Sequence, residues 1–127
     1  MTEKTKILIV DDDTLLAKMY QKKFEIEGFE ITTAGDGEEG LARAKEFKPD
    51  LIMLDIMMPK MDGFETLKQL KSSDDTKTIP VVFLTNLASD EEDAKKGLSL
   101  GAETYLIKSK FTPAGIVEKV KEVFDKN

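Results

Sequence analysis

Short apolar runs alternate along the chain with longer segments in which apolar residues recur every three or four positions. The short runs are rich in Ile, Leu, Val and Met and contain few polar residues, which is typical of strands buried on both faces. We predict five strands, at 7–10, 29–34, 51–54, 79–84 and 104–107. We predict five helices after them, at 14–27, 37–47, 62–71, 89–101 and from 112 onward.

Polar residues support the predicted helix boundaries. Three helices begin with the capping-box pattern, an acceptor followed three residues later by glutamate: Asp36 with Glu39, Asp62 with Glu65, and Ser89 with Glu92. Gly28 suits the end of the first helix, and Pro113 suits the first turn of the last one. Strands that alternate with helices predict an α/β fold, with a parallel sheet and helices on both of its faces.

Composition narrows the possible chemistry. The chain has 127 residues, the size of one domain, and it contains neither cysteine nor histidine. Disulfide frameworks, thiol catalysis, cysteine-ligated zinc and Ser-His-Asp chemistry are therefore excluded. Carboxylates, hydroxyls and lysine remain, and they suit a hard cation such as Mg²⁺.

Charge and hydropathy bear on location and partners. The formal net charge is -6 and the pI is about 4.8, which argues against a dedicated nucleic-acid surface. The first six residues are polar, unlike a signal peptide, and no apolar run approaches the roughly 20 residues of a membrane span. We expect a cytoplasmic protein without direct contact to nucleic acid or membrane.

The predicted strands end in residues that one mechanism could use together. The first strand is followed by Asp11, Asp12 and Asp13, the third by Asp55, the fourth by Thr85 and Asn86, and the fifth by Lys108. Ligands bind outside the carboxyl ends of the strands in open α/β sheets. Clustered carboxylates raise one another's pKa unless a cation lies between them, so the pattern predicts a Mg²⁺ site.

A phosphoryl-transfer role would use each of these groups. Asp55 can act as a nucleophile toward phosphorus, while Lys108 and Thr85 hold phosphoryl oxygens. Simpler interpretations exist for single residues. Asp13 can be the N-cap of the first helix, Lys108 a solvated surface lysine, and Thr85 an ordinary turn residue. The methionines at 57, 58 and 61 favour loop packing over a metal site.

Four motifs resemble the receiver domains of two-component response regulators, in particular single-domain receivers of the chemotaxis type. They are Ile-Leu-Ile-Val-Asp-Asp-Asp at 7–13, Leu-Asp-Ile-Met-Met-Pro-Lys-Met-Asp-Gly at 54–63, Phe-Leu-Thr-Asn at 83–86 and Gly-Ala-Glu-Thr-Tyr-Leu-Ile-Lys at 101–108. The resemblance covers essentially the whole chain and implies one receiver domain over residues 1–127. It also implies a flavodoxin-like, doubly wound sheet with strand order 2-1-3-4-5.

The resemblance assigns roles to individual residues. Asp55 is expected to be the phosphoacceptor, with Thr85 and Lys108 binding the phosphoryl group. The expected Mg²⁺ ligands are Asp11 (mainly through water), Asp12, Asp55 and the main-chain carbonyl of Met57. Tyr105 is expected to change rotamer with the state of Thr85.

The resemblance also implies partners. A histidine kinase or histidine phosphotransfer protein would donate the phosphoryl group, since this chain has no histidine. A downstream protein would bind the face made by the fourth helix, fifth strand and fifth helix. No turnover of an external substrate is expected beyond assistance to the chain's own phosphorylation and dephosphorylation.

Two local features carry further expectations. Receivers usually have proline after the conserved lysine, with a cis bond between them; here Ser109 follows Lys108, so the loop either holds a costly cis bond or takes a trans path. Met57 and Leu87 lie two positions after Asp55 and Thr85 and are expected to flank the phosphoryl group. Because both are apolar, neither can orient an attacking water, which predicts slow self-dephosphorylation.

Parts of the sequence fit three alternative functions. Asp11-Asp12-Asp13-Thr14-Leu15 resembles the start of a haloacid-dehalogenase-type phosphatase, but Leu15 stands where that motif has threonine. An unphosphorylated interaction module could share the fold, although all the chemical positions are filled by competent residues. A flavodoxin would need hydroxyls and main-chain N–H groups after the first strand, where this chain has three acids.

Overall fold

The computed structural model describes residues 4–86 and 91–126. Its strands are β1 (Lys6–Val10), β2 (Glu30–Ala34), β3 (Leu51–Leu54), β4 (Val81–Thr85) and β5 (Thr104–Ile107). Its α-helices are α1 (Thr14–Ile26), α2 (Gly37–Phe47), α3 (Gly63–Ser72), α4 (Glu91–Ser99) and α5 (Pro113–Lys126), and a 3-10 turn, η1, covers Lys108–Lys110. The predicted alternation of strands and helices is confirmed.

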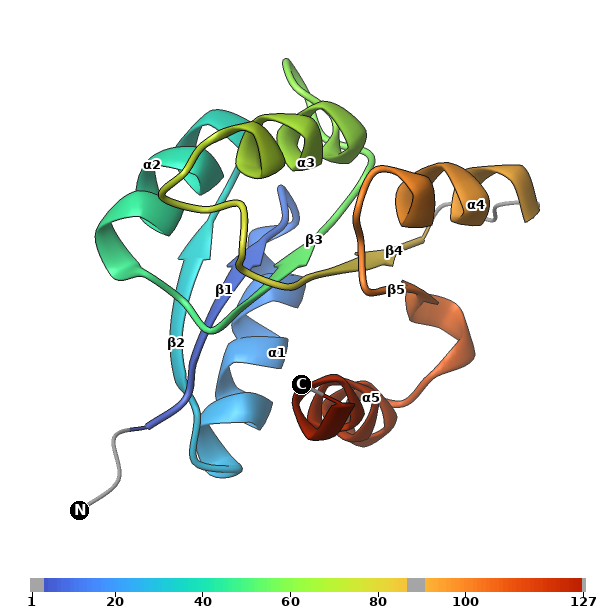
Figure 1. Ribbon diagram of the computed structural model, residues 1–127. Coiled ribbons are helices and arrows are strands. Elements are labelled where there is room, and N and C mark those ends of the chain that lie inside the picture. Colours follow the sequence, from blue (N-terminus) through green and yellow to red (C-terminus); the bar gives the residue numbers. More distant parts are fainter. Residues whose placement is uncertain (1–3, 87–90, 127) are drawn as a thin grey trace.

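The five strands form one parallel sheet in the order β2-β1-β3-β4-β5 (Figure 1). This is the predicted flavodoxin-like order, in which β1 lies between β2 and β3. The chain moves outward from β1 to β2 and then crosses back to β3, so the loops after β1 and β3 leave the sheet next to each other. Open sheets of this kind place their ligand site at that change of direction.

Helices cover both faces of the sheet. Helices α1 and α5 lie on one face, and α2, α3 and α4 lie on the other (Figure 1). The sheet contributes apolar side chains to a core on each face, because almost every residue of β1, β3 and β4 is buried. Helix α5 packs on the sheet through one apolar face: Ile116, Val117, Val120 and Val123 are buried, and Phe124 stacks on Phe29.

The fourth strand differs from its prediction. It spans Val81–Thr85 and not 79–84, because Ile79 still belongs to a turn in which its N–H donates to Thr76 O. Pro80 has no N–H to donate, although its carbonyl accepts from Ile52 N. Thr85 is therefore the last residue of the strand and is held by strand pairing.

The helix caps form as predicted only in part. The carboxylates of Asp36 and Asp62 accept from Glu39 N at 2.8 Å and from Glu65 N at 2.9 Å. The glutamate half of each capping box is absent from the described residues: Glu39 pairs with Arg43 and Glu65 bonds Gln69, each one turn further along its helix. The cap predicted at Ser89 with Glu92 lies outside what is described.

No helix within 4–86 and 91–126 is both long enough and apolar enough to cross a membrane. The predicted start of the fourth helix, at residue 89, lies outside the described residues, and the other predicted boundaries agree with the structure to within one or two residues. Such shifts are the ordinary uncertainty of an element's ends.

Candidate functional site

A hollow of about 300 Å³ opens at the carboxyl ends of the central strands. Its walls come from residues at or after the carboxyl ends of β1, β3, β4 and β5: Asp11, Asp12, Asp13, Asp55, Met57, Thr85, Asn86 and Lys108. The structure thus brings together every predicted catalytic and metal-binding residue. Asn86, to which the sequence assigns no role, lines the same hollow.

Strand register explains why the two buried acids meet. Val10 is paired with Leu54, so the next residues, Asp11 and Asp55, leave adjacent strands at the same level. The N–H of Asp55 continues the ladder by donating to Val10 O at 2.9 Å. The two carboxylates are therefore positioned by main-chain hydrogen bonds of the sheet.

The same argument places the other pair of groups. Thr85 is paired with Ile107 at the ends of β4 and β5, and Lys108 follows directly. Thr85 and Lys108 are both buried. Because lysine is rarely buried unless its charge is paired, Lys108 is expected to have an acidic partner.

Lys108 finds its partners in the two buried acids. Its Nζ lies 2.6 Å from Asp11 Oδ2 and 3.3 Å from Asp55 Oδ2. The second oxygen of each acid accepts a main-chain hydrogen bond: Asp13 N donates to Asp11 Oδ1 at 2.9 Å, and Ile56 N donates to Asp55 Oδ1 at 2.7 Å. Each carboxylate is thus fixed on one side by the backbone and faces the lysine with the other.

The electrostatic balance favours a cation in the hollow. Burial raises the pKa of the Asp11 carboxyl, against the effect of Lys108, and the Asp55 charge adds to the rise. Burial alone would lower the pKa of Lys108, but its hydrogen bond to Asp11 and the charges of Asp11 and Asp55 outweigh it, so its pKa is raised. One ammonium between two buried carboxylates leaves net negative charge.

Asp12 completes a group of three acids. Carboxylate oxygens of Asp11, Asp12 and Asp55 all lie within 4.8 Å of one another, and Asp12 is exposed at the mouth of the hollow. Hard oxygen donors in this arrangement fit Mg²⁺, which keeps several waters and takes one or two carboxylates. Asp13 is not part of this group: it caps α1 by accepting from Leu16 N at 3.1 Å.

The loop after Asp55 contains a close approach that the sequence did not reveal. Gly63 donates its N–H to Ile56 O at 2.8 Å, and a Cβ added at Gly63 would collide with Asp55 O. Glycine is needed here because the start of α3 packs on the main chain of the candidate phosphoacceptor. Only tertiary structure shows this reason.

Three other predictions concern the surroundings of the hollow. Met57 lines it and is largely exposed, while Leu87 lies outside the described residues. The Tyr105 ring is half-buried on β5 and lies against Phe83 of β4, with ring centroids 6.0 Å apart. The bond between Lys108 and Ser109 is trans, because the described residues contain no cis peptide, and η1 begins there.

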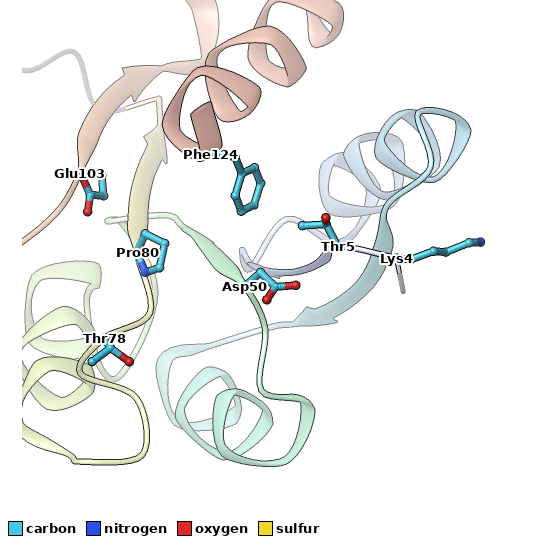
Figure 2. A pocket seen from close by; sticks show the side chains of 7 residues that line it. All are labelled: Lys4, Thr5, Asp50, Thr78, Pro80, Glu103 and Phe124. Carbon is cyan, nitrogen blue, oxygen red and sulfur yellow. The ribbon is translucent and has the colours of Figure 1, made fainter. Parts of the chain in front are cut away.

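A larger hollow, of about 650 Å³, lies at the opposite end of the sheet. Figure 2 shows its lining side chains spread around the rim, with Phe124 from α5 and with Glu103 and Lys4 at opposite sides of the view. Asp50, in this rim, accepts a hydrogen bond from Lys6 N at 2.8 Å. None of the residues that line this rim is a buried lysine or a buried carboxylate. The larger hollow therefore lacks the cluster of charged groups that the smaller one has.

A flavodoxin-like sheet with an acidic hollow at the carboxyl ends of its strands is the architecture of receiver domains. A sequence model of the response regulator receiver domain matches residues 7–121. The chain therefore belongs to the response regulator receiver family, which is consistent with a phosphorylation-dependent signalling switch.

Relatives and solved structures agree with this assignment. The alkaline phosphatase synthesis transcriptional regulatory protein PhoP of Bacillus subtilis (strain 168) is 44% identical over 119 residues, covering 93% of this chain and 48% of that protein. Chemotaxis protein CheY4 of Vibrio cholerae superimposes with a TM-score of 0.87 at 33% identity, covering 95% of this chain and 99% of that one.

A third comparison concerns a liganded receiver. A CheX-CheY-BeF3-Mg+2 complex from Borrelia burgdorferi matches with a TM-score of 0.86 and 36% identity, covering 94% of this chain and 89% of that chain. The present chain spans about half the length of the curated relatives it matches.

Proposed function

We propose that this chain is a phosphorylation switch in which Asp55 accepts a phosphoryl group. The observation that carries the proposal is the setting of Asp55: its carboxylate is buried, Oδ1 accepts a hydrogen bond from Ile56 N, and Oδ2 lies 3.3 Å from Lys108 Nζ in the wall of the hollow. A carboxylate held in this way has one oxygen oriented for attack on phosphorus. The ammonium of Lys108 lies where it can stabilise the negative charge of the incoming phosphoryl group.

The proposed transfer uses Asp55 Oδ2, because Oδ1 is occupied by the main chain. A lone pair of Oδ2 forms the new bond to phosphorus as the bond between phosphorus and the donor's leaving atom breaks, and the leaving group departs with that electron pair. Lys108 then turns from the carboxylates to a phosphoryl oxygen, and the Thr85 hydroxyl donates to another. These groups stabilise charge where it develops.

Asp11, Asp12, Asp55 and the main-chain carbonyl of Met57 are the proposed ligands of a Mg²⁺ ion. When bound, Mg²⁺ neutralises negative charge between the carboxylates and the phosphoryl oxygens. The three carboxylates that lie within 4.8 Å of one another support this set, as does the Mg²⁺ named with the Borrelia burgdorferi receiver.

The proposed output runs through β4 and β5. Thr85 ends β4 opposite Ile107, and the Tyr105 ring packs on Phe83 of the same strand pair. Movement of the Thr85 hydroxyl toward a phosphoryl group would therefore be passed to Tyr105 and to the face made by α4, β5 and α5. That face is the proposed binding surface for a downstream protein, which recognises one of two states.

The proposed donor is a histidine kinase or a histidine phosphotransfer protein, or a small molecule such as acetyl phosphate. We further propose that residues 1–127 act as one receiver domain in the cytoplasm, that its own contacts are with proteins and not with nucleic acid or membrane, and that it turns over no external substrate.

Intact-protein mass spectrometry tests the proposal. The protein is incubated with acetyl phosphate and Mg²⁺, with and without a chelator, and Asp55→Asn is treated in parallel. We expect one phosphoryl group on the wild type, lost with the substitution or the chelator. Absence of an adduct under every condition would contradict the proposal and favour an unphosphorylated interaction module.

A further inference from the structure

The sulfur of this chain lies entirely in methionine, since the sequence has six methionines and no cysteine. Among the described methionines, Met57 is the most exposed at 62%, compared with 39% for Met19 and 1% for Met53. Met58 and Met61 are only partly exposed. Because oxidation of a thioether depends on access, Met57 is the described methionine that an oxidant reaches most easily.

Met57 also lines the hollow that contains Asp55, Thr85 and Lys108. Its loop is fixed on the inner side, where Ile56 N donates to Asp55 Oδ1 and Ile56 O accepts from Gly63 N. The residue after Ile56 is therefore held beside the proposed phosphoacceptor. Its thioether is a weak acceptor and gives this side of the hollow an apolar wall.

We propose that Met57 is a site of reversible oxidation by peroxide and that this modification shortens the lifetime of the phosphoryl group on Asp55. The inference rests on the proposed function of Asp55. In the modification, a sulfur lone pair of Met57 attacks one oxygen of hydrogen peroxide, and an S–O bond forms as the O–O bond breaks. The departing hydroxide takes the proton from the oxygen now bound to sulfur and leaves as water. Sulfur is oxidised by two electrons and the peroxide is reduced by two.

The sulfoxide changes the hydrogen bonding available at the mouth of the hollow. Its oxygen is a strong acceptor and can hold a water molecule next to the phosphoryl group, which the thioether cannot do well. That water attacks phosphorus, the bond from phosphorus to the Asp55 oxygen breaks, and the electron pair of that bond restores the carboxylate. Inorganic phosphate leaves with the oxygen of the water, whose proton passes to the phosphate or to solvent. One additional hydrogen bond to the attacking water predicts a roughly fivefold faster decay.

The test compares wild type, Met57→Leu and Met19→Leu. Each protein is treated with hydrogen peroxide or buffer, oxidised positions are identified by peptide mass spectrometry, and the protein is then loaded with acetyl phosphate and Mg²⁺. The decay of the phosphoryl adduct is followed after the donor is removed. The quantity compared is the ratio of decay rates with and without peroxide within each protein, so a different baseline in Met57→Leu does not affect the result.

We expect Met57 to be oxidised before Met19, decay to accelerate in wild type and Met19→Leu, and the ratio to stay at one in Met57→Leu. Treatment with methionine sulfoxide reductases A and B should restore the slow decay. An equal acceleration in Met57→Leu, or an unchanged decay in wild type oxidised at Met57, would overturn the inference while leaving the proposed function intact. Failure of the untreated wild type to take up a phosphoryl group would instead refute both.

Discussion

The two ends of the sheet carry comparable residues and differ in how those residues are used. At the amino end, Asp50 directly precedes β3 and its carboxylate accepts from Lys6 N. At the carboxyl end, Asp55 directly follows β3 and shares a buried lysine with Asp11. Asp50 links two chain segments through a hydrogen bond. Asp11 and Asp55 share one lysine, so their site keeps a net negative charge that can bind a cationic ligand.

Helix direction explains part of this difference. The helices that follow the strands begin near the carboxyl end, where Asp13 and Asp62 cap α1 and α3. Helix N-termini carry partial positive charge and favour anions, so carboxylates and an incoming phosphoryl group are both less costly at that end. The hollow at the amino end is about 650 Å³ against about 300 Å³, which shows that volume alone does not identify the reactive end.

Removing the shared lysine should have the largest effect among the variants considered below. In Lys108→Met the phosphoryl oxygens lose a buried cationic donor, so we expect phosphoryl uptake from acetyl phosphate to slow by about 100-fold. Lys110→Met is the matched control because Lys110 is exposed two residues further along. Uptake is measured by intact mass against time, and equal rates in the two variants would show that the lysine does not contribute to transfer.

Neighbouring acids at the carboxyl end should separate by role. Asp12→Asn removes a charged Mg²⁺ ligand and should lower Mg²⁺ affinity about thirtyfold. This factor corresponds to about 2 kcal/mol, the size of one polar interaction with a charged group. Asp13→Asn keeps the N-cap acceptor for Leu16 N and should change affinity by less than about threefold. Calorimetric titration measures both, and similar losses would contradict the assignment of Asp13 as a cap only.

The apolar wall of the hollow should control phosphoryl lifetime. Met57→Asn places an amide where it can orient a water, so decay of the phosphoryl adduct should accelerate about tenfold. Met57→Glu should act in the same direction. Met19→Asn, an exposed methionine on α1, is the control. A decay rate in Met57→Asn equal to that of the wild type would refute the predicted role of this position.

A lysine near the amino end should affect stability alone, with the smallest effect. Lys71 Nζ donates to Lys77 O at 3.2 Å and Ile79 O at 3.0 Å, and burial lowers the pKa of this lysine. Lys71→Met should reduce the free energy of unfolding by about 1 kcal/mol, because two carbonyl partners are lost. Urea unfolding measures this against Lys68→Met, which is exposed. Slower phosphoryl uptake in Lys71→Met would contradict the prediction that this lysine affects stability alone.

Sequence pattern predicted the parts of the fold and site that depend on local periodicity and on strand ends. The strand order came from the family resemblance, and the acids and lysine were found because each follows an apolar run. The strand register brings the two buried acids together, because Val10 pairs with Leu54 and Asp11 and Asp55 follow these residues directly.

Long-range features were not predictable in the same way. Lys108 Nζ reaches Asp11 across 97 positions of sequence, and only the folded chain shows that Lys108 also contacts Asp55. The sequence left a cis or trans bond open at Ser109. The collision that forbids a side chain at Gly63 involves the carbonyl of Asp55, at the other end of the same connection, and depends on how that connection folds back on itself. The side chains of Glu39 and Glu65 interact with residues one turn further along their helices and not with the cap residues. Such side-chain pairs within a helix are similar in energy to the predicted capping contact.

The most direct test of the central claim is the position of the phosphoryl group itself. The loaded protein is reduced with borohydride, which converts an aspartyl phosphate to homoserine, and the product is located by peptide mass spectrometry. The proposed site predicts homoserine at position 55 alone, with unchanged aspartate at positions 11, 12 and 50. Homoserine at position 50, or at either Asp11 or Asp12 with Asp55 unchanged, would contradict the account.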